Sequence, residues 1–462
     1  MKDLTQGNIY KNFFFFSIPI VLSSLLSSAF GVINTSIAGQ FLGAEGLAAT
    51  SISSPYTNVI ILIGNGYSYG FSVLAGNLFG AKSYERLRRM LYSNMLAIFL
   101  VLLAIVGLSV AFYTPIFHFL KVEAHIWDVS KWYFILACLN ILVWQMNSMS
   151  LYCCHAMGET KFPLIVSFFS TGLTVVGNLL TVAWFDWGVV GIGVSTIVAS
   201  VVSLICYWIR FCKYFRTLGL EDKLVRPSFA DVKALASYSL PNIVQQVAMG
   251  GTALAIAPVR NGLGYLVVAA FSVADRLKGY LQTFYYSASK TASNYIAQCV
   301  GAGKYHKVKK AVYVSILQGF IFFFLLFLPI YIFADFTCAL FVNRSTDPEV
   351  FEYLHIFIRI YLPTIALHVF CGIFHSILRA VKSNLHLIIT SLGGGLVTLA
   401  ATFLLAPRFG IHGVYAACSI GWGFECLYVF LLWVTGFWLP PALRSKVLNR
   451  VPKKTVDPLE DP

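Results

Sequence analysis

Twelve apolar stretches divide this sequence, and each is long enough to cross a lipid bilayer as a helix. The first stretch, residues 13–39, contains no charged residue and would form a helix of about 40 Å. The stretches are 13–39, 47–74, 91–112, 130–155, 163–184, 189–212, 235–259, 266–296, 311–334, 352–378, 386–406 and 412–437. The sequence therefore predicts an all-α membrane protein with twelve transmembrane helices.

The composition excludes a soluble globular protein. Hydrophobic residues make up 58% of the chain and charged residues 11%, whereas a soluble domain has about 25% charged residues. The net charge of +14 does not indicate a nucleic-acid partner, because the basic residues lie in short loops between apolar stretches. The ten cysteines show no ligand spacing and are expected to be small core residues.

The distribution of Lys and Arg predicts the orientation. If the N-terminus is cytoplasmic, most of the 33 basic residues fall in cytoplasmic loops and tails, as the positive-inside rule requires. The main clusters lie at 82–89, 210–233, 304–310 and in the C-terminal tail. Both termini are therefore expected to be cytoplasmic.

The chain contains an internal repeat. A shift of about 221 residues places 17–19 on 239–241, 47–51 on 268–272 and 80–84 on 301–305. We expect two parallel six-helix lobes, 1–212 and 235–437, joined by a cytoplasmic linker at 213–234 and followed by a basic tail at 438–462. Parallel repeats of this kind are typical of transporters whose substrate site lies between the halves.

Several short motifs resemble a known family. They are Leu4-Thr-Gln-Gly7, Asn34-Thr-Ser-Ile-Ala-Gly39, the segment 42–49, the loop 76–89 and the turn 156–163. Their order and spacing over residues 4–437 resemble the multidrug and toxic compound extrusion (MATE) family and its DinF-like prokaryotic branch. This family is part of the multidrug/oligosaccharidyl-lipid/polysaccharide flippase superfamily.

The resemblance implies a fold and an activity. It implies two six-helix lobes around a central cavity, in a multi-pass protein of the prokaryotic plasma membrane that functions as a monomer. It also implies export of bulky organic cations or drugs against an inward flow of protons or sodium ions. No cofactor is expected beyond that gradient.

The sequence departs from the family pattern where the resemblance places coupling carboxylates. Asn34 occupies one such position, and Val182, four residues after the matching Asn178, occupies the other. An amide cannot carry a proton, although the oxygens of Asn34 and Asn178 are weak candidates for coordinating sodium. Asn34 either lines an ion site or makes a hydrogen bond between helices.

Ionisable residues remain inside the apolar stretches of the second half. Each costs about 2.5–3.5 kcal/mol at the membrane centre unless it has a partner or water. Steps of four residues place Lys278, Gln282, Tyr286 and Lys290 on one helix face that could line the cavity. Alternatively, Asp275 and Lys278 form a structural i, i+3 pair and Lys290 extends toward the interface. The charged candidates are Asp275, Arg276, Lys278, Lys290, Arg359, His368 and Glu425.

Amide side chains supply a second group of candidates. Gln245 and Gln246 follow Pro241, and Asn140, Gln145 and Asn147 lie among Trp and Met residues. Amides beside aromatic and Met side chains suit flat organic cations. The same residues are also common in ordinary helix packing.

The sequence bears on three classes of function. The repeat and the ordered motifs favour a secondary active exporter of organic cations or drugs. The alternative is a flippase or exporter of a lipid-linked or anionic amphiphile, which is favoured by the missing carboxylates and by the basic residues of the second half. A membrane-embedded enzyme is disfavoured, because the sequence has no HExxH motif or nucleophile elbow.

Overall fold

The computed structural model describes residues 2–119, 122, 127–220, 226–342, 344–345 and 347–448. Residues 221–225 of the predicted linker and 449–462 of the predicted tail lie outside these residues. The described residues form helices without a strand, which confirms the all-α prediction. The main helices are α1 (Ile9–Ile52), α2 (Ser54–Gly80), α3 (Tyr84–Ala111), α5 (Trp127–Ala156), α6 (Lys161–Asn178), α7 (Gly188–Thr217), α8 (Phe229–Asn261), α9 (Tyr265–Gly301), α10 (His306–Ile332), α13 (Ile365–Ala380), α14 (Asn384–Phe409) and α15 (Ile411–Thr435).

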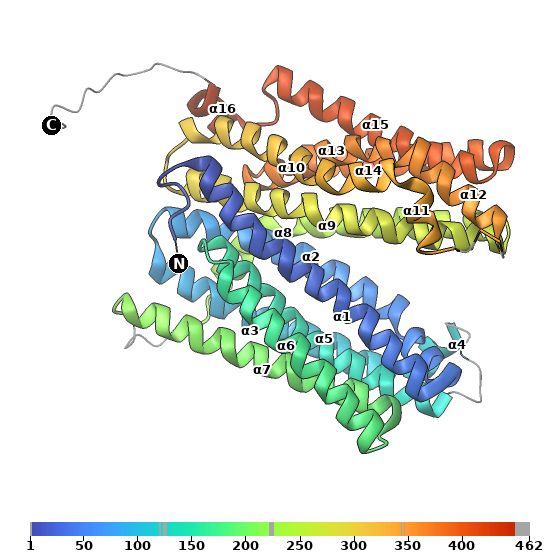
Figure 1. The fold of residues 1–462 in the computed structure, drawn as a ribbon. Coiled ribbons are helices and arrows are strands. Elements are labelled where there is room, and N and C mark those ends of the chain that lie inside the picture. The colour runs from blue at the N-terminus through green and yellow to red at the C-terminus, as the bar shows by residue number, and fades with distance from the viewer. Residues whose placement is uncertain are drawn as a thin grey trace, which may run out of the picture.

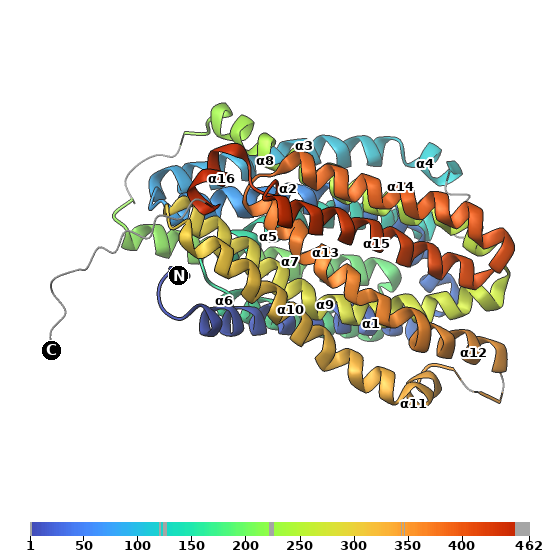
Figure 2. The same ribbon diagram turned by 90° about the horizontal axis from the view of Figure 1, so that it is seen from above.

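Shorter elements lie between and after these helices. They are α4 (Tyr113–Phe119), the π-helical turn η2 (Leu179–Trp184), α11 (Ala334–Ala339), α12 (Pro348–Ile356), the π-helical turn η3 (Phe357–Tyr361), the 3₁₀ turn η4 (Leu362–Thr364) and α16 (Pro441–Leu448). Within each half the long helices run side by side, and in Figure 1 the helices of the first half, such as α1 and α7, are tilted relative to those of the second half, such as α9 and α10. Figure 2 shows the same bundle from above. Helix α1 bends at Gly43, whose φ of 64° strongly favours glycine.

Ten helical segments of the described chain are long and apolar enough to cross a membrane. Helices α8 and α9 span 33 and 37 residues but are not among these ten. Both coincide with predicted stretches, at 235–259 and 266–296, and both carry amide or charged side chains along their length. Such side chains are accommodated in a membrane when they face the protein interior or water.

Two apolar cores hold the helices together, and each recruits a helix from the other half. One core is built from α2, α3, α5 and α7 and includes Leu235 of α8. The second core lies mainly among α9, α10 and α13 and includes Phe13, Phe16 and Ile20 of α1. The N-terminal end of α1 therefore packs in the core of the second half, and the N-terminal end of α8 packs in the core of the first half.

Candidate functional site

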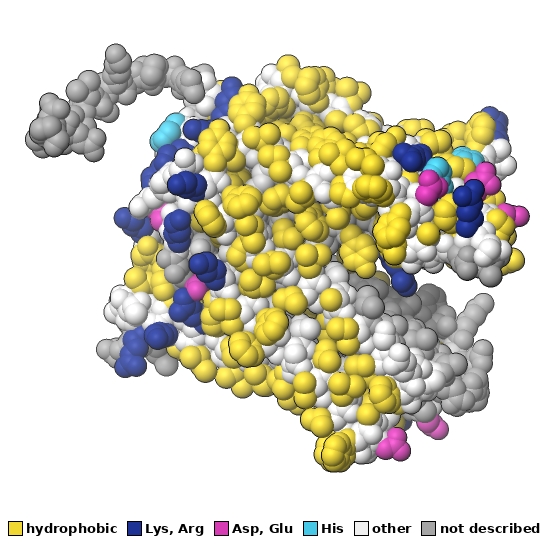
Figure 3. Space-filling view, viewed as in Figure 1, with side chains coloured by type: hydrophobic (Ala, Val, Ile, Leu, Met, Phe, Trp, Pro, Cys, Tyr) yellow, Lys and Arg dark blue, Asp and Glu magenta, His cyan; other side chains and the backbone are white. Residues whose placement is uncertain are grey.

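The two halves meet at the end of the molecule that carries the N-terminus and most basic side chains (Figures 1 and 3). Helices α2 and α9 approach so closely here that a Cβ at Gly80 would overlap the carbonyl oxygen of Gln298. A Cβ at Gly301 would likewise overlap the carbonyl oxygen of Asn77. Under the shift predicted from the sequence, Gly80 corresponds to Gly301 and Asn77 to Gln298, so the two contacts are equivalent. At the opposite end, Figure 3 shows the surface hollowed between the halves.

Two further equivalent contacts join the halves at the same end. The Asp231 carboxylate of α8 lies 2.7 Å from Nε of Arg89 and 3.7 Å from Nε of Arg86, both on α3. In the other repeat, the Lys310 ammonium of α10 lies 5.5 Å from the centre of the Tyr10 ring of α1. The repeat pairs Lys310 with Arg89 and Tyr10 with Asp231. A salt bridge and a cation–π contact thus occupy corresponding positions.

The N-terminal segment also contacts the second half at this end. Lys304 Nζ donates to Thr5 Oγ1, and Lys307 Nζ donates to the Thr5 carbonyl, each at 2.7 Å. Partial burial raises the pKa of the Asp3 carboxyl, but hydrogen bonds from Thr5 and Gln6 outweigh this and bring the pKa below its ordinary value. Asp3 therefore remains ionised near Lys304 at neutral pH.

A cavity of about 500 Å³ lies within the first half. Asn140, Trp144 and Asn147 of α5 line it, so two of the three amides predicted on that helix face the cavity. The described lining carries no formal charge. Gln145 is turned instead into the packing between α5 and α2, where its Nε2 donates to Ser68 Oγ at 3.0 Å. The sequence could not separate these amides, because they differ only in the helix face that they occupy.

Asn34 and Asn178 are in direct contact. Asn178 Nδ2 donates to Asn34 Oδ1 at 2.6 Å, linking α6 to α1. Val182, in the next turn, packs with Ala38 and Ile192. Asn178 Oδ1 is buried and has no hydrogen-bond partner among the described residues, which leaves one free neutral oxygen at this contact. No group of three His, Cys, Asp or Glu residues able to hold a metal occurs in the described chain.

A second cavity, of about 350 Å³, lies in the second half. The Asp275 carboxylate lies at its wall, 2.9 Å from Nη1 of Arg260 and 2.7 Å from Nζ of Lys278. The structural pair predicted for Asp275 and Lys278 is therefore present, and Arg260 completes it from α8. Gln282 lines the same cavity, whereas Arg276 is exposed and does not line it.

Glu425 of α15 lies at the inner wall of this second-half cavity. Its Oε2 is 3.9 Å from Nε2 of His375 on α13, and only 12% of the Glu425 side-chain surface is exposed. A Cβ at Gly394 of α14 would overlap the Glu425 carboxyl group, so the glycine provides the space for it. The result is a protonatable pair shielded from bulk water.

A third cavity, of about 290 Å³, lies where the halves meet. Gln245 and Gln246 of α8, Lys290 of α9 and Tyr69 of α2 line it together with Arg379, from the last turn of α13. Arg379 directly follows the predicted apolar stretch 352–378 and lies close to Lys382, a pattern typical of a cytoplasmic loop. Its guanidinium nevertheless extends back into the cavity.

The predicted polar face of α9 is divided between two cavities. Lys278 and Gln282 line the second-half cavity, and Tyr286 and Lys290 line the cavity between the halves. His368 of α13 lines both. The steps of four residues thus predicted the face, but not its division.

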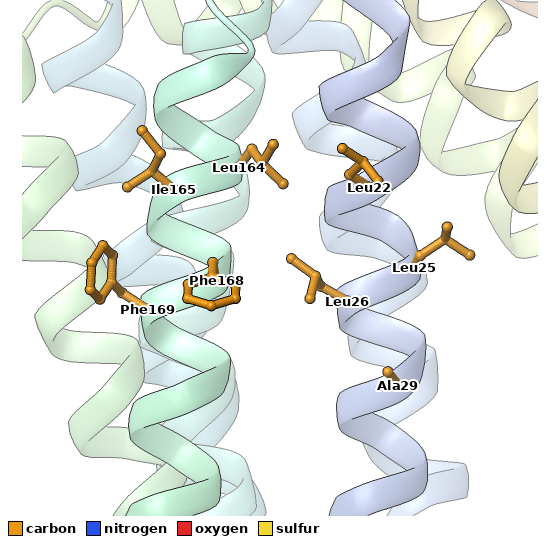
Figure 4. Close-up of a pocket in the computed structure, with 8 residues that line it drawn as sticks. All are labelled: Leu22, Leu25, Leu26, Ala29, Leu164, Ile165, Phe168 and Phe169. Carbon is orange, nitrogen blue, oxygen red and sulfur yellow. The ribbon is translucent and has the colours of Figure 1, made fainter.

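The largest of these spaces is an apolar groove of about 550 Å³ between α1 and α6. Figure 4 shows leucines of α1 beside leucine and aromatic side chains of α6. The groove is lined by Leu22, Leu25, Leu26, Ala29, Leu164, Ile165, Phe168 and Phe169. Phe168 and Phe169 are mostly exposed, so the groove suits lipid chains better than a polar cargo.

The comparisons with known proteins agree with this architecture. A sequence model of the MatE family matches residues 19–180 and 241–404, so the chain belongs to the MatE family and is a multi-pass transporter of the cell membrane. It is 24% identical over 355 residues to the probable multidrug resistance protein YoeA of Bacillus subtilis, covering 74% of this chain and 75% of YoeA. It is 20% identical over 423 residues to the multidrug export protein MepA of Staphylococcus aureus, covering 90% and 92%.

Solved structures show the same fold. The Vibrio cholerae MATE transporter VcmN in the bent form has a TM-score of 0.85 and 18% sequence identity. The superposition covers 95% of this chain and 97% of VcmN. The sequence-based family resemblance is thereby confirmed.

Proposed function

We propose that this chain is a secondary active exporter of small, drug-like organic molecules that works by alternating access. In this proposal twelve helices cross the membrane as two six-helix lobes, with both termini and the basic loops in the cytoplasm. The contacts between α2 and α9 then close the cytoplasmic side, and the hollow between the halves opens outward. These reciprocal contacts at the basic end are the observation that carries the proposal.

The names of the relatives YoeA and MepA support drugs as the cargo class. The uncharged cavity of the first half, with Trp144 and the three amides of Asn65, Asn140 and Asn147, suits a flat organic cation or a neutral drug. The cavity between the halves contains Lys290 and Arg379, and the second-half cavity contains Asp275, Lys278 and Glu425, so both carry ionisable side chains. The ionisable groups that could couple transport to an ion gradient therefore lie outside the first-half cavity.

We assign ion coupling to the second half. Asn34 and Asn178 offer only neutral amide oxygens, whereas Glu425 beside His375 can bind and release a proton. A sodium ion could use the free oxygen of Asn178, although no carboxylate strengthens that site. Protons are therefore the favoured coupling ion. The other ionisable side chains in the two cavities that this pair borders include His368 and Arg379 on α13, Asp275, Lys278 and Lys290 on α9, and Arg260 on α8.

Efflux from proteoliposomes tests this function. A fluorescent drug would be loaded, and a proton gradient, a sodium gradient or no gradient would be imposed in turn. We expect movement driven by the proton gradient, and loss of that drive in Glu425→Gln with passive exchange retained. If no gradient moves the dye while the protein is folded and inserted, coupled export is wrong for this chain.

A further inference from the structure

The cavity between the halves is basic. Lys290 and Arg379 both line it, His368 and His375 border it, and its described lining contains no Asp or Glu. Each of the four side chains either carries a positive charge or can acquire one, and none can become negative. The described lining therefore carries positive charge and has no acidic side chain of its own to balance it.

The Arg379 guanidinium is held in place by neutral groups. Its Nε donates to Oδ1 of Asn242, and its Nη2 donates to Oε1 of Gln245 at 2.9 Å. The guanidinium also lies 4.4 Å from the centre of the Tyr69 ring. These contacts fix its orientation but do not neutralise it, and a guanidinium has further N–H groups for a ligand.

Lys290 is also without an acidic partner. Its ammonium lies 5.8 Å from the centre of the Tyr152 ring, and no described carboxylate lies within 4.0 Å. The nearby acids have other contacts, since Asp275 pairs with Arg260 and Lys278. Glu425 lies beside His375 instead.

Two like charges sharing one cavity inside a membrane protein are costly unless an anion enters. We propose that this cavity binds the acidic group of an organic anion, namely a carboxylate, sulfonate or phosphate. Lys290 would contribute a point charge, and Arg379 would contribute N–H donors in a fixed plane. The cargo charge is thus opposite to that of the cations implied by the family resemblance.

The neighbouring second-half cavity has room for the rest of such a molecule. Met249 and His368 line both cavities, so the two spaces adjoin. Phe271, Tyr415 and Trp422 give the second cavity aromatic walls, which suit an apolar or aromatic body. The inferred cargo is an amphiphilic organic anion, and its transport rests on the export function proposed above.

A pair of probes with the same ring and opposite charge tests the inference. Naphthalene sulfonate and naphthyl trimethylammonium would be titrated into the purified full-length protein in a neutral detergent at low salt, and binding measured by calorimetry. We expect the sulfonate to bind more tightly than the ammonium compound. Lys290→Gln should weaken sulfonate binding about tenfold or more, because it removes a charge-assisted contact.

Two further variants make the result specific. Arg359→Gln removes another cation of the second half, which lies against the Tyr331 ring and does not line this cavity. It should change sulfonate affinity by less than about twofold. Lys290→Arg keeps the charge and should bind the sulfonate within about threefold of the wild type, which controls for folding. Equal binding of both probes, or equal effects of Lys290→Gln and Arg359→Gln, would overturn the anion site.

The outcomes also separate this inference from the export function. Sulfonate binding that depends on Lys290, without gradient-driven movement in proteoliposomes, would keep the anion site and refute export. Gradient-driven export of the ammonium probe, with no sulfonate binding, would keep export and refute the anion site.

Discussion

The amide of Asn178 donates a hydrogen bond of 2.6 Å to Oδ1 of Asn34 and so joins α6 to α1. The family resemblance places coupling carboxylates at Asn34 and, one turn beyond Asn178, at Val182. The packing around Val182 is apolar, and the Asn34–Asn178 contact has no group that can titrate. The first half therefore has a structural link where the resemblance implies a proton site.

Asn34→Asp should create a titratable group at this link. A carboxylate would accept the same hydrogen bond from Asn178 and add a charge that is sensitive to pH. We expect the initial rate of efflux to become more dependent on pH than in the wild type, as measured in proteoliposomes from mildly acidic to mildly alkaline pH. Asn94→Asp is the matched control, because Asn94 Oδ1 also accepts a hydrogen bond, from Tyr67, and Asn94 does not line the cavities described above. An unchanged pH profile would show that Asn34 does not face the ion pathway.

Local patterns predicted much of this molecule. The apolar stretches located the long helices, and the i, i+3 spacing predicted the pair of Asp275 and Lys278. The repeat predicted which positions correspond, including Gly80 and Gly301. These features depend on short-range spacing or on repetition, both of which a single sequence contains.

The rest depends on contacts between distant segments. Arg379 follows an apolar stretch directly and belongs to a basic pair with Lys382, so it has the pattern of a cytoplasmic loop residue. Only the packing of α13 against α8 and α2 places its guanidinium beside Gln245 and Tyr69. Arg260 likewise directly follows the apolar stretch 235–259, and its pairing with Asp275 is not visible in the spacing. Such pairings are set by the tertiary fold, which spacing along the chain does not encode.

Gly301→Val should prevent closure at the basic end. A Cβ at this position would overlap the Asn77 carbonyl oxygen of α2, and backbone atoms in packed helices cannot easily move aside. We expect spin labels placed on α2 and α9 at this end to move apart, as measured by electron paramagnetic resonance. Gly279→Val is the control on the same helix, since a Cβ there meets no atom within 4 Å. Identical distances in both variants would mean that this contact does not hold the end closed.

Asp231→Asn should loosen the same end. The Asp231 side chain is only 4% exposed and pairs with Arg86 and Arg89, which are about half exposed. Because the arginines reach water, the free energy of unfolding should fall by about 1–2 kcal/mol, which is less than the loss of a fully buried ion pair would cause. Thermal unfolding of the purified protein measures it. Asp335→Asn is the control, because the Asp335 side chain is 71% exposed beside His355 and should change stability by less than about 0.5 kcal/mol. Equal losses would exclude a special role for Asp231.

Gly394→Ala should displace the carboxyl group of Glu425. The added methyl group would overlap the carboxyl oxygen and Cγ of Glu425, at a cost of about 1–3 kcal/mol for overpacking. We expect lower thermal stability together with loss of proton-driven efflux. Gly423→Ala on α15 is the control, since a Cβ there meets no atom within 4 Å.

A double variant shows whether the two effects of Gly394→Ala have one cause. In the double variant Gly394→Ala with Glu425→Ala, the overlap disappears because both side chains are small. The double variant should therefore lose less stability than the sum of the losses of the two single variants. Proton-driven efflux should stay absent, because no carboxyl group remains beside His375. Strictly additive losses of stability would show that the methyl group disturbs another contact. Recovery of proton drive in the double variant would remove Glu425 from the coupling mechanism.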